Sequence, residues 1–202
     1  MSKYTAISAV SSTLQTLLRQ QISADPQLSL LINPQTSVSL RSPKAIREPG
    51  NPDSGADVSV WLYRVTRNEY TLNNRPDRSV ANQVPRAFIP INLYYLITPM
   101  DEDPELQQTV LGKVLQAFND HAILRGSDLL GSLQGTTEEL RLSLEMPSLE
   151  ELSQVWDALN EPYQLSVCYQ VQVVTIESGL EPVQAQPVLV RNTTYAQILD
   201  SQ

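Results

Sequence analysis

The chain has 202 residues, 41% of them hydrophobic and 18% charged, with a formal net charge of −8. This length suits one well-buried domain, and the acidic balance argues against nucleic-acid binding because phosphate contacts need clustered Lys and Arg. The longest unbroken apolar run, from Leu93 to Ile97, is far shorter than the roughly 20 residues of a transmembrane helix, and the N-terminus lacks a charged-then-apolar signal. We therefore expect a cytoplasmic protein without direct membrane insertion.

The charge is unevenly distributed along the chain. Residues 41–86 hold eight basic and five acidic residues, a net charge of +3, whereas residues 87–202 hold four basic and sixteen acidic residues, a net charge of −12. A mildly basic segment on an acidic body allows head-to-tail association between copies or attachment to a complementary partner. An acidic surface that only keeps the protein soluble gives the same pattern, so both interpretations stay open.

The first part of the chain predicts a helix over residues 5–20 and a short strand over residues 38–41. The helix has apolar residues at three- and four-residue spacing that share one face: Ile7, Val10, Leu14, Leu17 and Leu18. Three prolines and two glycines follow between positions 43 and 55. Their fixed and permissive backbone angles suit neither helix nor strand, so this segment is predicted to be a mobile loop.

Two strands are predicted next, over residues 57–67 and 87–98, with a polar, Arg-rich segment between them. Residues 68–86 contain two prolines and read as an exposed loop, and a loop of this length in a small domain is more often functional than decorative. The basic side chains of this region are our candidates for binding an acidic neighbour: Arg67, Arg75, Arg78 and Arg86.

A helix begins after Asp103, which can cap it, with Pro104 at its first position, where a missing N–H costs nothing. Its apolar stripe consists of Leu106, Val110, Leu111, Val114, Leu115 and Phe118. A strand with one solvent-facing side follows, because Leu140, Leu142, Leu144 and Met146 alternate with polar residues.

Residues 147–174 encode a short capped helix that runs into a long strand. Ser148 and Glu151 form a capping box, and Pro162 stops the helix. Its apolar stripe is Leu149, Leu152, Val155, Trp156 and Leu159, with Trp156 expected between the helix and the sheet. From Tyr163 the period becomes two, so the apolar residues Tyr163, Leu165, Val167, Tyr169, Val171 and Val173 share one face of a strand and Gln164, Ser166, Cys168, Gln170 and Gln172 the other.

After Gly179 the chain continues with a tail whose apolar residues could pair as a strand: Val183, Val188, Leu189 and Val190. Pro182 and Pro187 remove two backbone donors, which suits an edge strand or an arm added to another subunit's sheet. A tail folded back onto its own sheet is equally compatible. We predict a domain over residues 1–179 and a C-terminal arm over residues 180–202. The fold class is α+β, a single domain with a mixed, mostly antiparallel sheet flanked by helices on one side.

Catalysis has little support in the sequence. His121 is the only histidine, which excludes multi-histidine metal sites, and no glycine-rich phosphate loop is present. The acids at positions 101–103 could hold a cation but suit a helix N-terminus better. Cys168 lies mid-strand, where a packed residue is more common than a reactive thiol. We therefore expect no enzyme, no metal and no cofactor, with a small cytoplasmic hydrolase as the alternative from a different class.

Residues 147–174 resemble the cap, or tail-terminator, family of phage-tail-like contractile injection systems, whose members combine a leucine-rich capped helix, a Trp, Pro-Tyr and an alternating strand. Three further segments fit the family: Ala6 to Val10, Val60 to Asn68, and the strand, acidic turn and helix from Ile91 to His121. The resemblance covers roughly residues 5–178 and implies a tail-terminator-like fold.

The resemblance also implies a function. A cap of this family ends the growing particle as a ring on the inner tube and sheath, and six-fold tubes imply a homo-hexamer. The implied partners are the sheath and inner-tube proteins and further copies of the chain. The alternative is an assembly chaperone or a membrane-anchor adaptor of the same machinery.

Overall fold

The computed structural model describes residues 4–33, 37–70 and 88–179, and the structural statements below concern these residues. In chain order the elements are α1 (Ala6–Ala24), α2 (Leu28–Leu31), β1 (Val38–Ser39), α3 (Pro43–Arg47), β2 (Val58–Arg67), β3 (Phe88–Pro99), α4 (Pro104–Asp120), β4 (Ile123–Arg125), the 3₁₀ turns η2 (Gly126–Asp128) and η3 (Gly131–Leu133), β5 (Glu139–Glu145), α5 (Leu149–Leu159) and β6 (Val167–Glu177).

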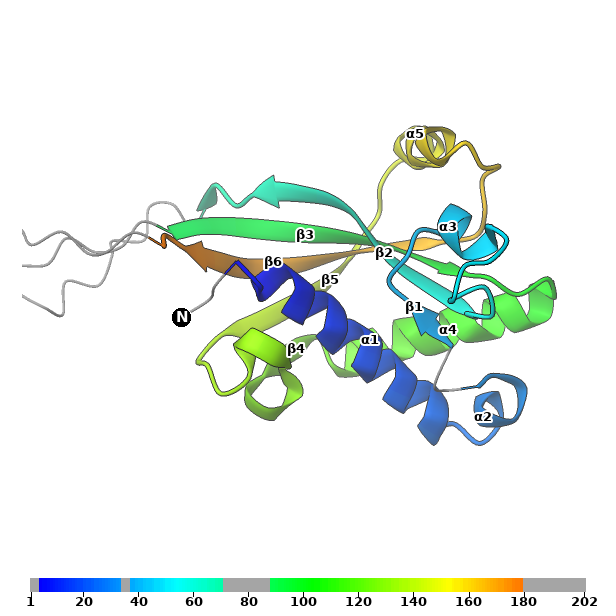
Figure 1. The fold of residues 1–202 in the computed structure, drawn as a ribbon, viewed down its shortest axis with the longest axis horizontal. Coiled ribbons are helices and arrows are strands. Elements are labelled where there is room, and N and C mark those ends of the chain that lie inside the picture. Colours follow the sequence, from blue (N-terminus) through cyan, green and yellow to red (C-terminus); the bar gives the residue numbers. More distant parts are fainter. Residues whose placement is uncertain (1–3, 34–36, 71–87, 180–202) are drawn as a thin grey trace, which may run out of the picture.

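One six-stranded sheet, in the order β1-β2-β3-β6-β5-β4, forms the centre of the molecule (Figure 1). β1 pairs with β2 in parallel, and all other neighbouring strands are antiparallel. The two long central strands, β3 and β6, pair over most of their length. The predicted α+β class with a mixed, mostly antiparallel sheet is therefore confirmed.

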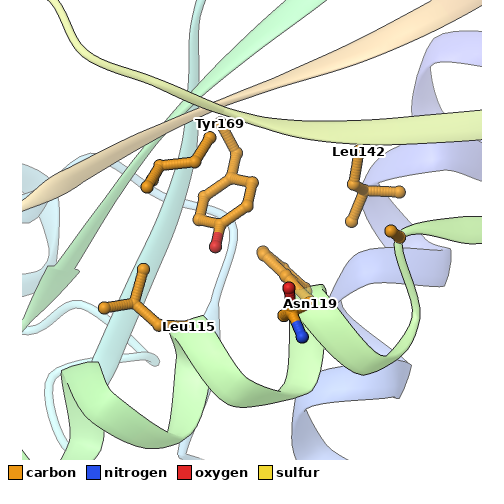
Figure 2. Close-up of a pocket in the computed structure, with 7 residues that line it drawn as sticks. Leu115, Asn119, Leu142 and Tyr169 are labelled. Carbon is orange, nitrogen blue, oxygen red and sulfur yellow. The ribbon is translucent and has the colours of Figure 1, made fainter.

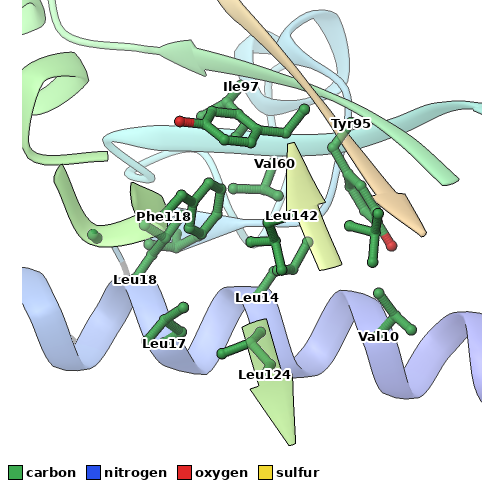
Figure 3. Packing of buried hydrophobic residues seen from close by; sticks show 14 of the residues in the cluster. Val10, Leu14, Leu17, Leu18, Val60, Tyr95, Ile97, Phe118, Leu124 and Leu142 are labelled. Atoms are coloured by element: carbon green, nitrogen blue, oxygen red, sulfur yellow. The ribbon is translucent and has the colours of Figure 1, made fainter. Parts of the chain in front are cut away.

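The main core lies between one face of the sheet and the helices α1 and α4. Figure 3 shows Val10, Leu14 and Leu18 of α1 directed toward the sheet, where they are fully buried. α1 extends four residues beyond the predicted end because Ile22 continues the apolar stripe, four positions after Leu18, and is also buried. The predicted inward face of this helix is correct for Val10, Leu14, Leu17 and Leu18.

The opposite face of the sheet is covered at one end by α5, so the prediction of helices on one side only is wrong (Figure 1). Trp156 and Leu159 pack there against Leu96 of β3 and Cys168 of β6. Trp156 is 1% exposed, which confirms its predicted position between helix and sheet. Cys168 could have indicated a helix on this face, because it is an apolar side chain among the glutamines and the serine of that strand face.

The predicted helix starts are confirmed by their hydrogen bonds. Ser148 Oγ accepts from the Glu151 N–H (3.2 Å), and the Glu151 carboxylate accepts from the Ser148 N–H (2.8 Å), which completes the capping box. Asp103 Oδ1 likewise accepts from the Glu105 N–H (3.1 Å) at the start of α4. α5 ends before Pro162, at Asn160, which adopts the left-handed conformation (φ 54°) common after a helix.

Two predicted segments differ from the structure. The predicted mobile loop at residues 43–55 contains α3, because Ser42 caps a helical turn whose first residue is Pro43. The last predicted strand begins at Val167 rather than Tyr163, and both Tyr163 and Leu165 are exposed. These two side chains lie in the connection from α5, before the strand joins the sheet.

Local irregularities also change which side chains enter the core. A register shift between β3 and β6 pairs Ile91 with Val174 but Leu93 with Val171, so Val174 joins Tyr169 and Val171 in the core. In β5 the predicted alternation holds for Leu140 and Leu142. Leu144 is 48% exposed, and Met146, at 89% exposed, lies beyond the end of the strand.

Candidate interaction surfaces

A row of hydrogen-bonded polar side chains crosses the sheet on the face that α5 covers only at one end. The Arg64 guanidinium of β2 lies over the Tyr94 ring of β3, 4.6 Å from its centroid. The Tyr94 hydroxyl accepts from Gln170 Nε2 of β6 (2.9 Å). Gln170 Oε1 in turn accepts from Gln172 Nε2 (2.7 Å) and from Ser143 Oγ of β5 (3.5 Å). The row thus links four adjacent strands.

This polar row holds its side chains in fixed orientations. Gln170 is buried, and its amide is hydrogen-bonded on both sides by its neighbours in the row. Its amide nitrogen and oxygen both have hydrogen-bond partners in the row, so burying them costs little. The result is a preorganised polar surface with amide, hydroxyl and guanidinium groups, which suits recognition of another protein surface better than bond-breaking chemistry.

At one end of the sheet, β2, β3 and β6 extend past the helices, on the left of Figure 1. Val65 and Ile89 are exposed there on the face that α1 covers further along. Arg67 ends β2 and is exposed, and the nearly fully exposed Tyr70 follows it. We call this part, β2 from Val65 and the strand ends beside it, the projecting end.

Of the predicted partner-binding residues, the structure describes Arg67 and places it on the projecting end. The others lie outside the described residues: Arg75, Arg78, Arg86, Val183, Val188, Leu189 and Val190. Part of the basic segment is neutralised within the chain, since Arg41 pairs with Asp53 (3.2 Å) and Arg47 with Glu161 (3.4 Å). Within the described ranges Arg67 forms no ion pair, so its charge is available to a neighbour.

An apolar groove of about 300 Å³ lies between α4 and β5 on the other face of the sheet (Figure 2). Its wall on the sheet side is formed by Tyr169, whose ring meets Phe118 edge-on with centroids 4.8 Å apart. Leu115 and Asn119 of α4 line the other side. The half-exposed Leu144 lies at the open edge of β5 beside it. Sequence patterning missed this groove because it depends on how α4 lies against β5.

The shifted pKa values of two titratable groups follow from burial and neighbouring charges. Burial, together with the nearby Asp101 carboxylate, raises the pKa of Asp57 to about 6. Burial beneath α5 raises the pKa of the Cys168 thiol, which makes it a poor nucleophile. Asp101 and Asp103 accept backbone N–H bonds at the start of α4, as expected for helix capping. In the described part of the chain, no group of three or more His, Cys, Asp or Glu side chains is arranged to hold a metal ion.

Among the residues that the structure describes, no helix combines the length and the apolar composition needed to cross a lipid bilayer. The candidate functional features of these residues are the polar row, the projecting end and the groove.

The fold is that of a tail-terminator domain: one mixed α+β unit whose mostly antiparallel sheet carries helices on both faces. The sequence model of the Pvc16 N-terminal domain family matches residues 9–189, and the chain belongs to this family. The resemblance to the cap family that the sequence indicates is confirmed. No curated protein matches the chain at a significant level.

Solved structures of two terminators are among those that share this fold. The PVC sheath/tube terminator of an extracellular contractile injection system, in its extended state, has 19% sequence identity and a TM-score of 0.59, over 100% of this chain and 67% of that one. The tube-terminating cap of the anti-feeding prophage has 21% identity and a TM-score of 0.55, over 92% of this chain and 60% of that one. The chain therefore spans about two thirds of the length of the terminators it resembles.

Proposed function

We propose that the protein is a structural cap that ends the inner tube and sheath of a contractile injection system, as a ring of six copies. The observation that carries this proposal is the family match over residues 9–189, together with a fold shared with a sheath/tube terminator along the whole chain. The chain spans only part of those terminators, so its action as a complete cap is itself part of the proposal. It acts as a binding protein without catalysis, in particles assembled in the cytoplasm.

The surfaces of the molecule support attachment to neighbours. The projecting end presents an exposed cation, Arg67, together with exposed apolar side chains. Residues 41–86 carry a net charge of +3 and residues 87–202 a net charge of −12, so the basic segment of one copy can meet the acidic body of the next. A contact between different patches on successive copies is heterologous, and such contacts close into a ring when the rotation between copies allows it.

Imaging of particles tests the proposal. The gene is expressed with its neighbouring sheath and tube genes, and the particles are compared with those made without it. We expect a six-fold density containing this chain at one end of each particle, and its loss when the gene is deleted. A terminal density without six-fold order overturns the ring, and a protein found only on unfinished particles indicates an assembly chaperone instead.

Three basic side chains between positions 67 and 78 give a residue-level test. Replacing Arg67, Arg75 and Arg78 together by Glu should leave the melting temperature unchanged while blocking attachment to the particle, and salt should weaken the attachment of the wild type. The single change Arg67→Glu has a matched control in Arg125→Glu, since both arginines are exposed and end a strand. Equal attachment of the two single variants would count against a role for Arg67.

We propose that residues 180–202 form an arm that pairs with a neighbouring subunit. Deletion of these residues should leave the melting temperature unchanged and abolish sheath binding. A large fall in melting temperature would instead place the tail within its own domain.

A further inference from the structure

The outer edge of β5 is covered by β4 over only part of its length. β4 pairs with Glu139 to Arg141, and the Leu142 N–H still bonds to the Ala122 carbonyl (2.8 Å). Among the described strands, none pairs with this edge beyond that point. Because alternate residues of an antiparallel strand direct their N–H and C=O to the same side, those of Leu144 point to the uncovered edge. Such an edge is ready to pair with another extended segment.

The uncovered edge borders the apolar groove between α4 and β5 (Figure 2). Leu144 belongs to both, since its backbone forms the edge while its side chain lines the groove. A strand added beside Leu144 would therefore direct alternate side chains toward Leu115 and Ala122 while its backbone paired with β5. An edge with a pocket for every second side chain is the arrangement by which proteins bind extended peptides.

The charges around this edge favour a basic partner. Residues 138–151 contain five acids and one arginine, and that arginine, Arg141, pairs with Glu139 (2.9 Å). Glu145 directly follows Leu144, and the exposed Asp120 directly follows Asn119 of the groove. A segment that fits here should therefore be apolar at alternate strand positions and carry a Lys or Arg next to them.

The chain contains such a segment in its own sequence. Val188, Leu189 and Val190 are followed by Arg191 and preceded by Pro187, a residue that edge strands tolerate. We infer that residues 188–191 of a second copy add to the open edge of β5 and fill the groove beside Leu144. The inference rests on the proposed function in one respect, the presence of copies side by side.

Length favours the tail of a neighbour over that of the same chain. Leu144 pairs with Tyr169, ten residues before Gly179. At about 3.3 Å per residue along the strand and about 10 Å across, the groove lies about 35 Å from Gly179. Leu189 follows Gly179 by ten residues, which span about 36 Å at most when fully extended. The tail would also have to reverse direction after β6, which shortens its reach, so the groove lies at the limit of the chain's own tail but not of a neighbour's.

Disulfide trapping in the full-length protein tests the inference. Leu144→Cys is mixed with Leu189→Cys, and in parallel with Val188→Cys and Val190→Cys to allow for register, in a glutathione redox buffer. Paired strands hold opposite Cα atoms at about 4.5–5.5 Å, within the range that a disulfide bridges. The control is Leu30→Cys, the same substitution at an exposed leucine of α2. The native Cys168 is buried, so it should not form a disulfide with the introduced cysteines.

We expect at least one mixture with Leu144→Cys to shift from the monomer to the disulfide-linked dimer position on a non-reducing gel, with the Leu30→Cys mixtures remaining monomeric. Equal dimer yields from Leu144→Cys and Leu30→Cys overturn the inference. An intrachain disulfide in the Leu144→Cys/Leu189→Cys double variant, without dimers in the mixtures, overturns it in favour of the chain's own tail. Whether the wild-type protein is recovered in sheath-and-tube particles is measured separately. If the wild type caps particles but the cysteine variants form no dimers, the result contradicts this inference and leaves the proposed function standing.

Discussion

The two ends of the sheet differ in how far helices cover their apolar side chains. At one end helices cover both faces, so Trp156, Leu96 and Cys168 lie under α5 while α1 and α4 fill the other side. At the projecting end the same strands, β2, β3 and β6, continue without helices and carry exposed apolar side chains and Arg67. The covered end accounts for stability, whereas the projecting end has surface left for a neighbour. Substitutions at the two ends should therefore differ in what they damage.

The largest effect is expected at Trp156, beneath α5. Trp156→Ala should lower the free energy of unfolding by about 3–5 kcal/mol, because it leaves a cavity where α5 packs on the sheet. Chemical denaturation measures it. In the described part of the chain the indole N–H has no hydrogen-bond partner, so Trp156→Phe should cost less than the alanine change. Leu149→Ala, at an exposed position of the same helix, is the control and should change stability by about 0.5 kcal/mol or less. Equal losses for Trp156→Ala and Leu149→Ala would contradict the packing of α5 on the sheet.

A smaller difference should separate two neighbouring tyrosines of β3 that face opposite sides. The buried Tyr95 hydroxyl bonds to Ser11 Oγ of α1 (2.8 Å), whereas the Tyr94 hydroxyl belongs to the more accessible polar row. Tyr95→Phe should cost about 0.5–1.5 kcal/mol, and Tyr94→Phe less, since water can replace its hydroxyl. Denaturation curves of both variants and of Ser11→Ala test this. A larger loss for Tyr94→Phe would mean that the polar row, rather than the α1 contact, carries more of the stability.

The sequence predicted the parts of the fold whose causes are local. The capping box at Ser148 and Glu151 and the Asp103-Pro104 start are short-range signals, and both helices begin there. The same kind of signal was present at Ser42-Pro43 but was outweighed by the surrounding prolines and glycines, so α3 was missed. Local capping patterns therefore predicted a helix start correctly where no cluster of prolines and glycines surrounded them.

The candidate surfaces could be predicted only in part, because they depend on contacts distant in sequence. Cys168 and Gln170 share one face of β6, yet the first is covered by α5 and the second lies in the polar row. The alternation of apolar and polar residues along β6 does not distinguish these two positions. The position of α5 determines which of them is covered. The shift that brings Val174 into the core also arises from pairing with β3. The sequence identified Arg67 as a basic candidate. Its location beyond the helices became clear only from the arrangement of the complete sheet.

The covered end also contains a carboxyl group whose ionisation opposes folding. Because the pKa of Asp57 is raised to about 6, well above its ordinary value, the folded state favours the protonated form. The destabilisation is absent below the unfolded pKa, develops as pH rises toward 6 and is complete above it. Asp57→Asn should therefore stabilise the protein at pH 7 relative to pH 4, by no more than about 1 kcal/mol after allowance for solvent screening of this half-exposed group.

Melting curves of the wild type and Asp57→Asn between pH 4 and pH 7 measure the difference in stability between the two proteins. Groups that titrate alike in both proteins do not affect this difference. Asp101→Asn is the matched control, since it removes the second cause of the shift and leaves burial, the first. It should give a smaller gain with the same pH dependence. A gain from Asp57→Asn that is equal at pH 4 and pH 7 would show that the carboxylate does not titrate in this window.

The smallest effect is expected in the polar row, where the sheet is open to solvent. Arg64→Met keeps much of the side-chain length but removes the cation over the Tyr94 ring, and such a contact at an accessible site is worth about 0.5–1 kcal/mol. A double-mutant cycle with Tyr94→Leu isolates this coupling from the separate cost of each change. A coupling energy near zero would mean that the guanidinium rests on the ring without stabilising it. Arg64 would then be held for contact with a partner, and its replacement should weaken particle attachment while leaving unfolding unchanged. A measurable coupling with undiminished attachment would instead assign the row to the stability of the domain.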